Sequence, residues 1–235
     1  MKNAVEIRNL NVSYGKTKVL QDVDLNIVLN SRTAIIGANG AGKSTLLKSI
    51  LGLIKIDCGD IKILDENIDS AKTKIAYVPQ KDSVNWDFPT TVYDVVMMGR
   101  YPYMKSFGRF SDNDKKIVVD ALNEMGILDL KDRQIKKLSG GQKQRVFLAR
   151  ALALDAEIYI LDEPLTGVDI KTEDIIASEF KRLQDLGKTI IAVHHNIYTL
   201  EKYFDNVVVL NKDVKYSGSL FIDGLDDFIN KGFRG

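Results

Sequence analysis

A glycine-rich segment, GANGAGKST at residues 37–45, joins a short apolar run to a run of helical composition. The apolar run at residues 33–36 predicts a buried strand, and residues 44–51 predict a helix. The segment fits the pattern GxxxxGK[ST], whose glycines let the backbone turn tightly and aim successive N–H groups at anionic oxygens. Strand, loop and helix in this order predict an α/β fold built around a phosphate-binding loop.

The loop offers three kinds of contact to a phosphate chain. The N-terminus of the following helix carries unpaired amides and roughly half a positive charge. Lys43 adds a full charge at the β- and γ-phosphates, and the Ser44 hydroxyl is placed to ligate Mg²⁺. A glycine-rich turn without a ligand is the alternative, and the order of the parts argues against it. The predicted binding residues are Gly37, Ala38, Asn39, Gly40, Ala41, Gly42, Lys43, Ser44 and Thr45.

Two adjacent carboxylates end a second apolar strand, predicted at residues 158–161. A carboxylate at a strand tip beside a phosphate nest can hold the Mg²⁺ shell, and this is the role predicted for Asp162. Glu163 is expected to face another way, because neighbours on an extended chain point to opposite sides. It is the predicted general base that polarises an attacking water. A solvated acidic pair is the alternative.

A third string, LSGGQ at residues 138–142, has the spacing of a capping box, with Ser at the N-cap and Gln at N3. Residues 143–154 then keep apolar side chains at helical spacing. The two glycines are expected to leave the amide end of this helix uncovered, which makes a second anion site. Since the chain already has one phosphate loop, something else must bring a phosphate here. The predicted residues are Ser139, Gly140, Gly141 and Gln142.

LSGGQ followed by QRVFLARAL resembles the signature motif of the ATP-binding-cassette (ABC) ATPases. The resemblance covers essentially the whole chain and implies a P-loop NTPase (RecA-like) fold: a parallel-sheet core, an N-terminal antiparallel β region and an inserted helical subdomain. It implies ATP and Mg²⁺ as cofactors. It also implies that two cassettes pair head to tail, the signature of one closing over the ATP of the other, and that hydrolysis opens the dimer.

The resemblance also implies roles for single residues. Tyr14, in VSYG, is similar to the aromatic residue that stacks on adenine, with an edge-strand tyrosine as the alternative. Gln80, in YVPQ, is similar to the glutamine that reaches Mg²⁺ and the attacking water while sensing the membrane partner. Asp169 stands where a loop of the family contacts the opposite cassette. The implied metal ligands are Ser44, Gln80 and Asp162.

Two adjacent histidines follow an apolar strand predicted at residues 190–193. His195 resembles the family's γ-phosphate sensor, whereas His194 is expected to be a packing or supporting residue. Asn196 stands where the family usually has an acidic residue after this histidine, and the difference puts only the local tuning of the site in doubt. The implied catalytic residues are Glu163, His195 and Gln80.

Composition places bounds on partners and location. The 235 residues suit one large domain, expected as a core at 1–82 and 155–235 with a helical subdomain at 83–154. Its 33 basic and 32 acidic residues leave a formal charge of +1, so no bulk attraction to nucleic acid is expected. The single Cys58 excludes an internal disulfide and suits a reducing cytosol. No apolar stretch approaches the ~20 residues that span a bilayer, so at a membrane another chain must do the crossing. The family resemblance implies a peripheral place at the cytoplasmic membrane face.

Periodicity divides the remaining chain into strands and helices. Alternating segments at 5–8, 22–27 and 61–64 predict antiparallel strands with one wet face. Apolar runs at 34–36, 75–78, 158–161 and 190–193 predict a parallel core, and mostly helical pattern fills the stretch between residues 80 and 139. Strand-like runs at 207–210 and 215–218 precede a short helix at 225–230.

The stretch after residue 80 predicts a partner surface. Thr91 and Asp94 predict a helix start, whose valines are expected to pack in the core. Trp86, Phe88, Tyr101 and Tyr103 flank the position where ABC cassettes form a groove for the coupling helix of a permease. The partners implied are transmembrane permease subunits, a second copy of the cassette and, indirectly, a solute-binding protein.

The strings VNWDFPTTVYDVVMMGRY and GVDIKTEDI with VHHN are similar to cassettes of manganese, zinc and iron-chelate importers. A further string, GRYPYMKSFGRFSDND, is more similar to cassettes of iron-siderophore and haem importers. The function predicted is therefore an importer of divalent metal, manganese first and zinc second, with the siderophore or haem class as the alternative. An importer of small organic nutrients, an exporter cassette, and a soluble ABC ATPase acting on ribosomes or DNA are the rivals.

Overall fold

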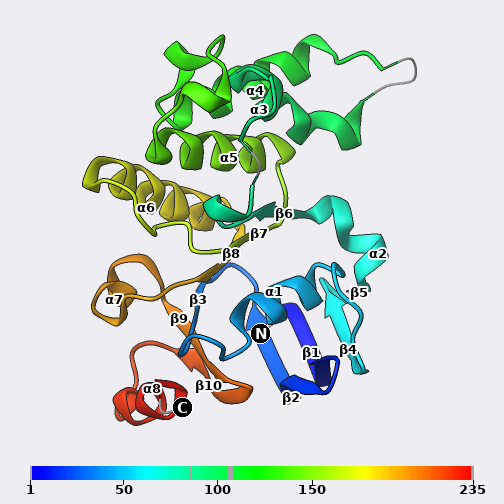
Figure 1. Ribbon diagram of the computed structural model, residues 1–235, viewed down its shortest axis with the longest axis vertical. Coiled ribbons are helices and arrows are strands. Elements are labelled where there is room, and N and C mark those ends of the chain that lie inside the picture. The colour runs from blue at the N-terminus through cyan, green and yellow to red at the C-terminus, as the bar shows by residue number, and fades with distance from the viewer. Residues whose placement is uncertain (1, 85, 105–107, 234–235) are drawn as a thin grey trace. The chain divides into compact units, whose positions relative to one another are not determined.

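The computed structural model describes residues 2–84, 86–104 and 108–233 (Figure 1). Residues 85 and 105–107, which belong to two of the strings compared with importers, lie outside this description. The chain divides into two compact units, one formed by residues 1–72 and 183–235 and the other by residues 73–182. Among the described residues, no helix combines the length and the apolar character needed to cross a bilayer. The subdomain boundaries expected from sequence stay a prediction.

The first unit contains an antiparallel sheet with the strand order β2-β1-β4-β5. Its strands are β1 (Asn3–Tyr14), β2 (Thr17–Val28), β4 (Cys58–Ile63) and β5 (Glu66–Asn67). The predicted antiparallel strands are confirmed. Strands β1 and β2 extend beyond the alternating segments predicted at 5–8 and 22–27. The alternation breaks between Ile7 and Leu10, where the pairing register shifts and Asn9 adopts a positive φ of 47°. This irregularity lets one strand run on through two short alternating stretches.

The same unit holds four strands in the order β10-β9-β3-β8. Strand β3 (Arg32–Ile36) pairs in parallel with both β8 (Thr189–Val193) and β9 (Asn206–Asn211), while β10 (Asp213–Ser219) is antiparallel to β9. The central strands are buried on both faces, as expected for continuous apolar runs. The helices of this unit are α1 (Lys43–Ile50), α2 (Ile68–Ala71), α7 (Leu200–Tyr203) and α8 (Leu225–Phe233), with a 3-10 turn at Ile197–Thr199.

The second unit pairs strand β6 (Ile75–Val78) in parallel with β7 (Ile158–Leu161), at the bounds predicted. Its helices are α3 (Val92–Met97), α4 (Asp112–Glu124), α5 (Gly140–Leu154) and α6 (Ile170–Asp185), and α5 packs against both α3 and α4 (Figure 1). Short 3-10 helices occupy Lys72–Lys74, Lys81–Ser83, Met98–Tyr103, Leu128–Leu130 and Ile135–Lys137.

Capping boxes fix where these helices begin. Thr91 caps α3 with Asp94, as predicted, and the valines of α3 are buried. Ser111 caps α4 in the same way with Asp114, whose other oxygen accepts from Arg100 Nε at 2.9 Å. Both members of this ion pair are buried, so Asp114 starts a helix and also neutralises a guanidinium in the interior.

Candidate functional site: the phosphate loop, the carboxylates and the signature helix

Three glycines give the phosphate loop its shape. Gly37, Gly40 and Gly42 have φ values of 152°, 82° and 98°, a region that residues with a Cβ rarely adopt. Helix α1 begins directly after Gly42, and no side chain caps its first amides. The tip at Asn39 and Gly40 is exposed. An uncapped helix start beneath a glycine turn is the arrangement that a chain of phosphates requires.

Lys43 directs its ammonium group at the loop's own backbone. Its Nζ donates to the carbonyl oxygens of Gly37 and Ala38, both at 2.9 Å, and the residue is 7% exposed. A nearly buried positive charge held at the mouth of an amide nest suits a triphosphate. Ser44, the next residue, is half-buried and Thr45 is buried. The residues present therefore fit the predicted cofactor ATP.

Neighbouring strands hold the loop closely. A Cβ at Gly37 would overlap the carbonyl oxygen of Leu210 in β9, and a Cβ at Gly42 would lie 2.7 Å from Cδ2 of Leu20 in β2. Close approach by these strands, through backbone at Gly37 and through a side chain at Gly42, therefore favours glycine in addition to the positive φ. The hairpin that contributes Leu20 also carries Tyr14, at the end of β1 and 51% exposed. The exposed ring is compatible with adenine stacking.

The two histidines have different surroundings. The main-chain N–H of His194 continues β8 by donating to Ile35 O at 3.0 Å, and its Nε2 lies 2.8 Å from the Thr199 hydroxyl oxygen. Its ring contacts Phe204, with centroids 5.4 Å apart. His194 is 7% exposed, which agrees with the packing role expected for it. His195 is exposed, at the carboxyl edge of the strands that also carries the phosphate loop.

In the second unit, the structure brings Gln80 and Glu163 together. The Gln80 side-chain amide donates from Nε2 to Oε2 of Glu163 at 3.1 Å. Asp162 continues β7 through its N–H, which donates to Val78 O at 2.9 Å, and its side chain is buried. The expectation that the backbone is extended at Glu163 is wrong, whereas the divergence of its side chain from Asp162 stays a prediction. Glu163 has a φ of 54°, so a left-handed turn, not strand alternation, redirects its carboxylate.

The signature segment forms the capping box that its spacing predicts. Ser139 Oγ accepts from Gln142 N at 3.3 Å, and Gln142 Oε1 accepts from Ser139 N at 3.0 Å, so α5 begins at Gly140. The glycines also serve packing. Gly141 is buried, and a Cβ there would lie 3.0 Å from both Asp169 Oδ2 and Thr172 Oγ1. The expected uncovered surface at this helix end is therefore partly covered by the segment that starts α6.

Sequence reasoning missed a local role for Asp169. Its two carboxylate oxygens accept from Thr172 N at 2.9 Å and Thr172 Oγ1 at 3.0 Å, which caps α6. These hydrogen bonds lower the pKa of Asp169. The spacing Asp-x-x-Thr before a helical run was the available signal. Asp169 therefore fixes the start of α6 next to the signature glycine Gly141.

Two of the four aromatic residues proposed for a partner groove line a cavity of about 200 Å³. Trp86 and Phe88 belong to it, together with Val95, Met98, Phe147 and Arg150 among others. Tyr101 and Tyr103 do not line this cavity: Tyr101 stacks on Phe110, and Tyr103 donates its hydroxyl to Leu154 O. The 3-10 turn at Met98–Tyr103 therefore contributes Met98 to the cavity but neither tyrosine.

Arg150 was not anticipated in this groove. Its guanidinium lies 4.4 Å from the centroid of Phe147 and donates to Tyr77 O at 3.1 Å, and burial lowers its pKa. Lys143 lies over Trp86, 4.9 Å from the ring centroid. The groove therefore combines an apolar floor with two cations.

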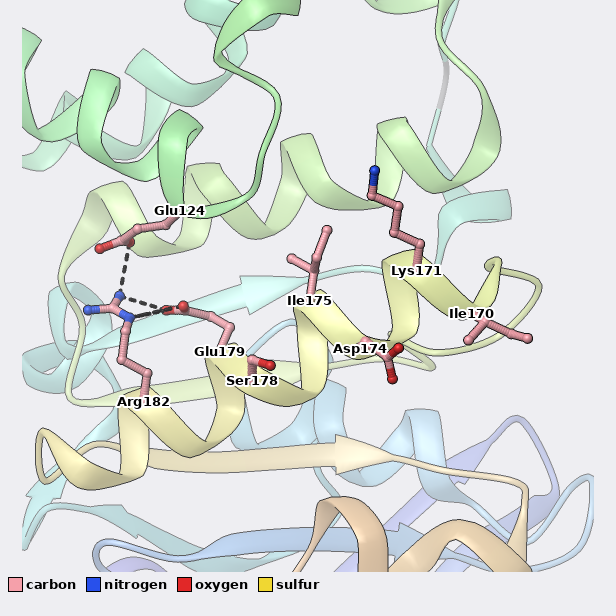
Figure 2. Close-up of a pocket in the computed structure, with 8 residues that line it drawn as sticks. All are labelled: Glu124, Ile170, Lys171, Asp174, Ile175, Ser178, Glu179 and Arg182. Carbon is pink, nitrogen blue, oxygen red and sulfur yellow. Dashed lines mark hydrogen bonds and ion pairs between the residues drawn. The ribbon is translucent and has the colours of Figure 1, made fainter.

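A larger hollow of about 650 Å³ contains none of the residues predicted for ATP (Figure 2). It lies along α6, with Glu124 of α4 at one end. Figure 2 shows Arg182 joined to Glu179 and Glu124, at 2.6 and 2.9 Å. Burial raises the pKa of Glu124, and Arg182 opposes that effect. Arg182, Glu179 and Glu124 are engaged with one another and form a structural ion-pair cluster.

The motifs can now be compared with known proteins. The family model for ABC transporters matches residues 20–166. The chain belongs to the ABC transporter family. This ABC cassette is 43% identical over 235 residues to the manganese transport system ATP-binding protein MntB of Halalkalibacterium halodurans, covering 100% of this chain and 94% of the relative. It is 43% identical to the zinc transport system ATP-binding protein TroB of Treponema pallidum, covering 99% and 87%.

A third relative, the manganese transport system ATP-binding protein MntB of Bacillus subtilis, is 48% identical over 88% of this cassette and 83% of that protein. A solved metal-chelate type ABC transporter in an inward-facing conformation is similar with a TM-score of 0.80 and 26% identity, covering 92% of this chain and 83% of that chain. The cassette MJ1267 in its ADP conformation shares the fold, with a TM-score of 0.81, 24% identity and coverage of 98% and 94%.

These likenesses confirm the predicted P-loop NTPase fold and the family that the signature motif indicated. The cassette is an ATPase subunit of an ABC transporter. Its parallel strands and its antiparallel sheet agree with that fold. The roles of individual residues remain predictions, as does Mg²⁺ as the accompanying metal ion.

Proposed function

We propose that this cassette is the ATP-hydrolysing subunit of an importer of divalent metal, with manganese the first candidate and zinc the second. The observation that carries this proposal is similarity over nearly the whole chain to cassettes named for manganese transport and zinc transport, at 43–48% identity. The cassette acts from the cytoplasmic face of the membrane, bound to permease subunits. Metal reaches the permease through a solute-binding protein, so the cargo never contacts this chain.

In the proposed site, residues of the first unit hold ATP. The amides of residues 37–45 cradle the phosphates, and the Lys43 ammonium group, already nearly buried, neutralises charge on them. Gly37 and Gly42 cannot accept a side chain without steric overlap, so neighbouring strands pack tightly against the loop at these two positions. Tyr14 stacks on adenine, and exposed His195 senses the γ-phosphate.

Residues of the second unit supply the chemistry. Asp162 and Gln80 of this unit, with Ser44 of the first unit, would hold Mg²⁺, which would supply charge neutralisation to the transferring phosphoryl group. Glu163 accepts the proton of the attacking water, and the hydrogen bond from Gln80 fixes the orientation of its carboxylate. The strained φ of 54° at Glu163 holds the carboxylate off the strand direction. Phosphoryl transfer needs this positioning more than covalent help from the protein.

A second copy of the cassette completes the proposed mechanism. The Ser139 capping box presents the amide end of α5, and in a head-to-tail dimer this end would meet the γ-phosphate bound by the partner. Asp169, held by Thr172, fixes the start of α6 beside Gly141. Closure therefore needs ATP, and hydrolysis removes the phosphate shared by the two chains.

The groove around Trp86 is the proposed docking site of the permease. Its floor is apolar, Phe88 is 61% exposed, and Lys143 and Arg150 place positive charge above the aromatic rings. An amphipathic helix with an apolar face fits such a surface. Trp86→Ala should weaken association with the permease. Tyr101 is exposed and does not line the cavity, so Tyr101→Ala should leave the association unchanged.

The proposal is tested by using Glu163→Gln with ATP as bait in detergent extracts of the native membrane. A polytopic permease together with a solute-binding protein that contains manganese or zinc is the expected result. Ribosomal or DNA-repair proteins, or no membrane protein at all, would contradict it. Lys43→Ala serves as the matched bait, because it should not form the ATP-dependent dimer.

A second candidate cargo has one observation in its favour. The solved metal-chelate type ABC transporter is similar over 92% of this chain at 26% identity. Iron bound to a siderophore or haem, recovered with the solute-binding protein in the same experiment, would select this alternative. The higher identity to the manganese and zinc cassettes keeps free divalent metal first.

A further inference from the structure

Helix α8, near the C-terminal end of the described chain, contacts the phosphate loop. The carbonyl oxygen of Gly232 accepts a hydrogen bond from Ala38 N at 3.2 Å. Ala38 is the second residue of the loop, and its own carbonyl accepts from Lys43 Nζ. Both residues belong to the first unit, where α8 packs against β9 and β10 (Figure 1). A residue almost two hundred positions away in sequence therefore binds the first turn of the loop.

One buried side chain and two contacts hold α8 against these strands. Ile229 is 7% exposed, the rings of Phe228 and Tyr216 lie 5.0 Å apart, and the Asn211 side chain donates to Lys231 O at 3.3 Å. Phe228, Ile229 and Lys231 belong to α8, whereas Tyr216 belongs to β10 and Asn211 to β9. The position of the Gly232 carbonyl is therefore set by packing at several points along α8.

Gly232 has a specific reason to lack a side chain. Gly232 is the second-last residue of α8 and is buried. A Cβ at Gly232 would overlap Cγ1 of Val209 in β9. Val209 is the register partner of Ile36, the residue directly before the loop. Glycine therefore allows α8 to approach the strand that supports the loop.

The opposite side of the loop is held by the turn between β9 and β10. Lys212 N donates to Ala41 O at 3.0 Å, and Lys212 O accepts from Gln21 N at 2.8 Å. The loop is therefore bound through backbone atoms at Ala38 on one side and at Ala41 on the other. Between these two points lies the exposed tip that carries Asn39 and Gly40.

We infer that Gly232 is a positioning residue for nucleotide binding, which acts on the phosphate loop through the main chain of Ala38. The inference rests on the proposed role of residues 37–45 in holding ATP. With Ala38 fixed by α8, the carbonyl that orients Lys43 is fixed as well. Displacing α8 frees the first turn and lets the Lys43 ammonium group lose its orientation, so the effect falls on ATP affinity.

The test is equilibrium binding of ATP to the isolated cassette, residues 1–235, by calorimetry. Gly232→Ala should weaken binding by about fivefold, the equivalent of one neutral hydrogen bond, and should speed hydrogen exchange of the Ala38 amide. Asn230→Ala, an exposed change on the same helix, should stay within about twofold of wild type. Val209→Ala alone should do the same, because the hydrogen bond between Gly232 and Ala38 joins main-chain atoms and does not involve the Val209 side chain.

The double variant Gly232→Ala with Val209→Ala separates positioning from a loss of folding. Removing Cγ1 of Val209 makes room for the new methyl group, so the double variant should regain the affinity of Val209→Ala. Unchanged affinity in Gly232→Ala, or a loss that the second change does not reverse, would overturn the inference. If wild type and Lys43→Ala bound ATP equally, the assignment of the loop itself would fail, and the inference with it.

Discussion

The side-chain amide of Gln80 donates to the carboxylate of Glu163 at 3.1 Å, across 83 positions of sequence. Gln80 follows β6 and Glu163 follows β7, and these strands pair in parallel with Val78 opposite Leu161. Their carboxyl ends therefore meet, which brings the two side chains together. The left-handed backbone at Glu163 completes the approach. A proposed sensor of the membrane partner thus holds the proposed general base directly.

Glu163→Gln should abolish most ATP hydrolysis while retaining ATP binding. The change removes the group that accepts a proton from water, a contribution typically worth about 10²–10⁴-fold in rate, and leaves Lys43 and the loop intact. The variant should form a stable dimer at saturating Mg-ATP, measured by light scattering. Glu157→Gln, an exposed carboxylate just before β7, is the matched control. A Glu163→Gln cassette that stays monomeric with ATP would contradict the two-chain site.

Lys43→Ala should lose most nucleotide affinity. A charge-assisted hydrogen bond contributes about 1.5–3 kcal/mol, which corresponds to roughly 10- to 150-fold in the dissociation constant. Lys48→Ala removes an exposed lysine from the same helix and should bind ATP as wild type does. Calorimetry of both variants makes the comparison. Equal ATP affinity in the two would remove Lys43 from the site.

Asp114 should contribute an acid-sensitive part of the stability. Hydrogen bonds from the side chain and main chain of Ser111, followed by Arg100, lower the pKa of Asp114 from 3.8 to about 2. The unfolded chain then binds more protons than the folded chain in this interval, so the stabilisation is present above pH 4 and is lost toward pH 2. Urea unfolding from pH 5 to pH 2 should show this fall.

The control for that prediction is a second carboxylate on the same helix. Asp114→Asn should be less stable at neutral pH and should show a shallower loss of stability below pH 4. Asp120→Asn changes an exposed side chain on the same helix and should leave the pH profile almost unchanged. Parallel profiles for wild type and Asp114→Asn would show that Asp114 does not cause the acid sensitivity.

The ion-pair cluster in Figure 2 should stabilise the second unit through Arg182. Arg182→Ala leaves the carboxylate of Glu179, whose side chain is 7% exposed, without its guanidinium partner. The expected cost is about 2 kcal/mol, below the ~3–5 kcal/mol of fully buried pairs because Arg182 is 42% exposed. Glu124→Gln should cost less than about 1 kcal/mol, since Glu124 is the more exposed partner. Equal losses in the two variants, measured by urea unfolding, would contradict this ranking.

Local motifs could be located from sequence because each depends on neighbouring residues. The capping boxes at Thr91 and Ser139, and the bounds of β6 and β7, follow from spacing and burial within short segments. The family followed from the signature string, and the comparisons confirm it. Each of these features depends on residues that lie only a few positions apart in the sequence.

Features that depend on distant segments were not accessible in this way. The backbone turn at Glu163, the place of Arg150 in the groove, and the contact between Gly232 and Ala38 each require tertiary packing. Tyr101 and Tyr103 were predicted to flank the groove, and neither lines the cavity that contains Trp86 and Phe88. Periodicity gives no information about which of several aromatic residues reaches a given cavity.

The most direct test of the account is ATP hydrolysis by the cassette reconstituted in lipid with its permease and its solute-binding protein. Binding protein loaded with manganese should stimulate hydrolysis and drive manganese into the vesicles, zinc should do so second best, and Glu163→Gln should abolish both. If neither metal stimulates hydrolysis or enters the vesicles while another cargo does, the proposed divalent-metal import is wrong and only the ABC ATPase remains.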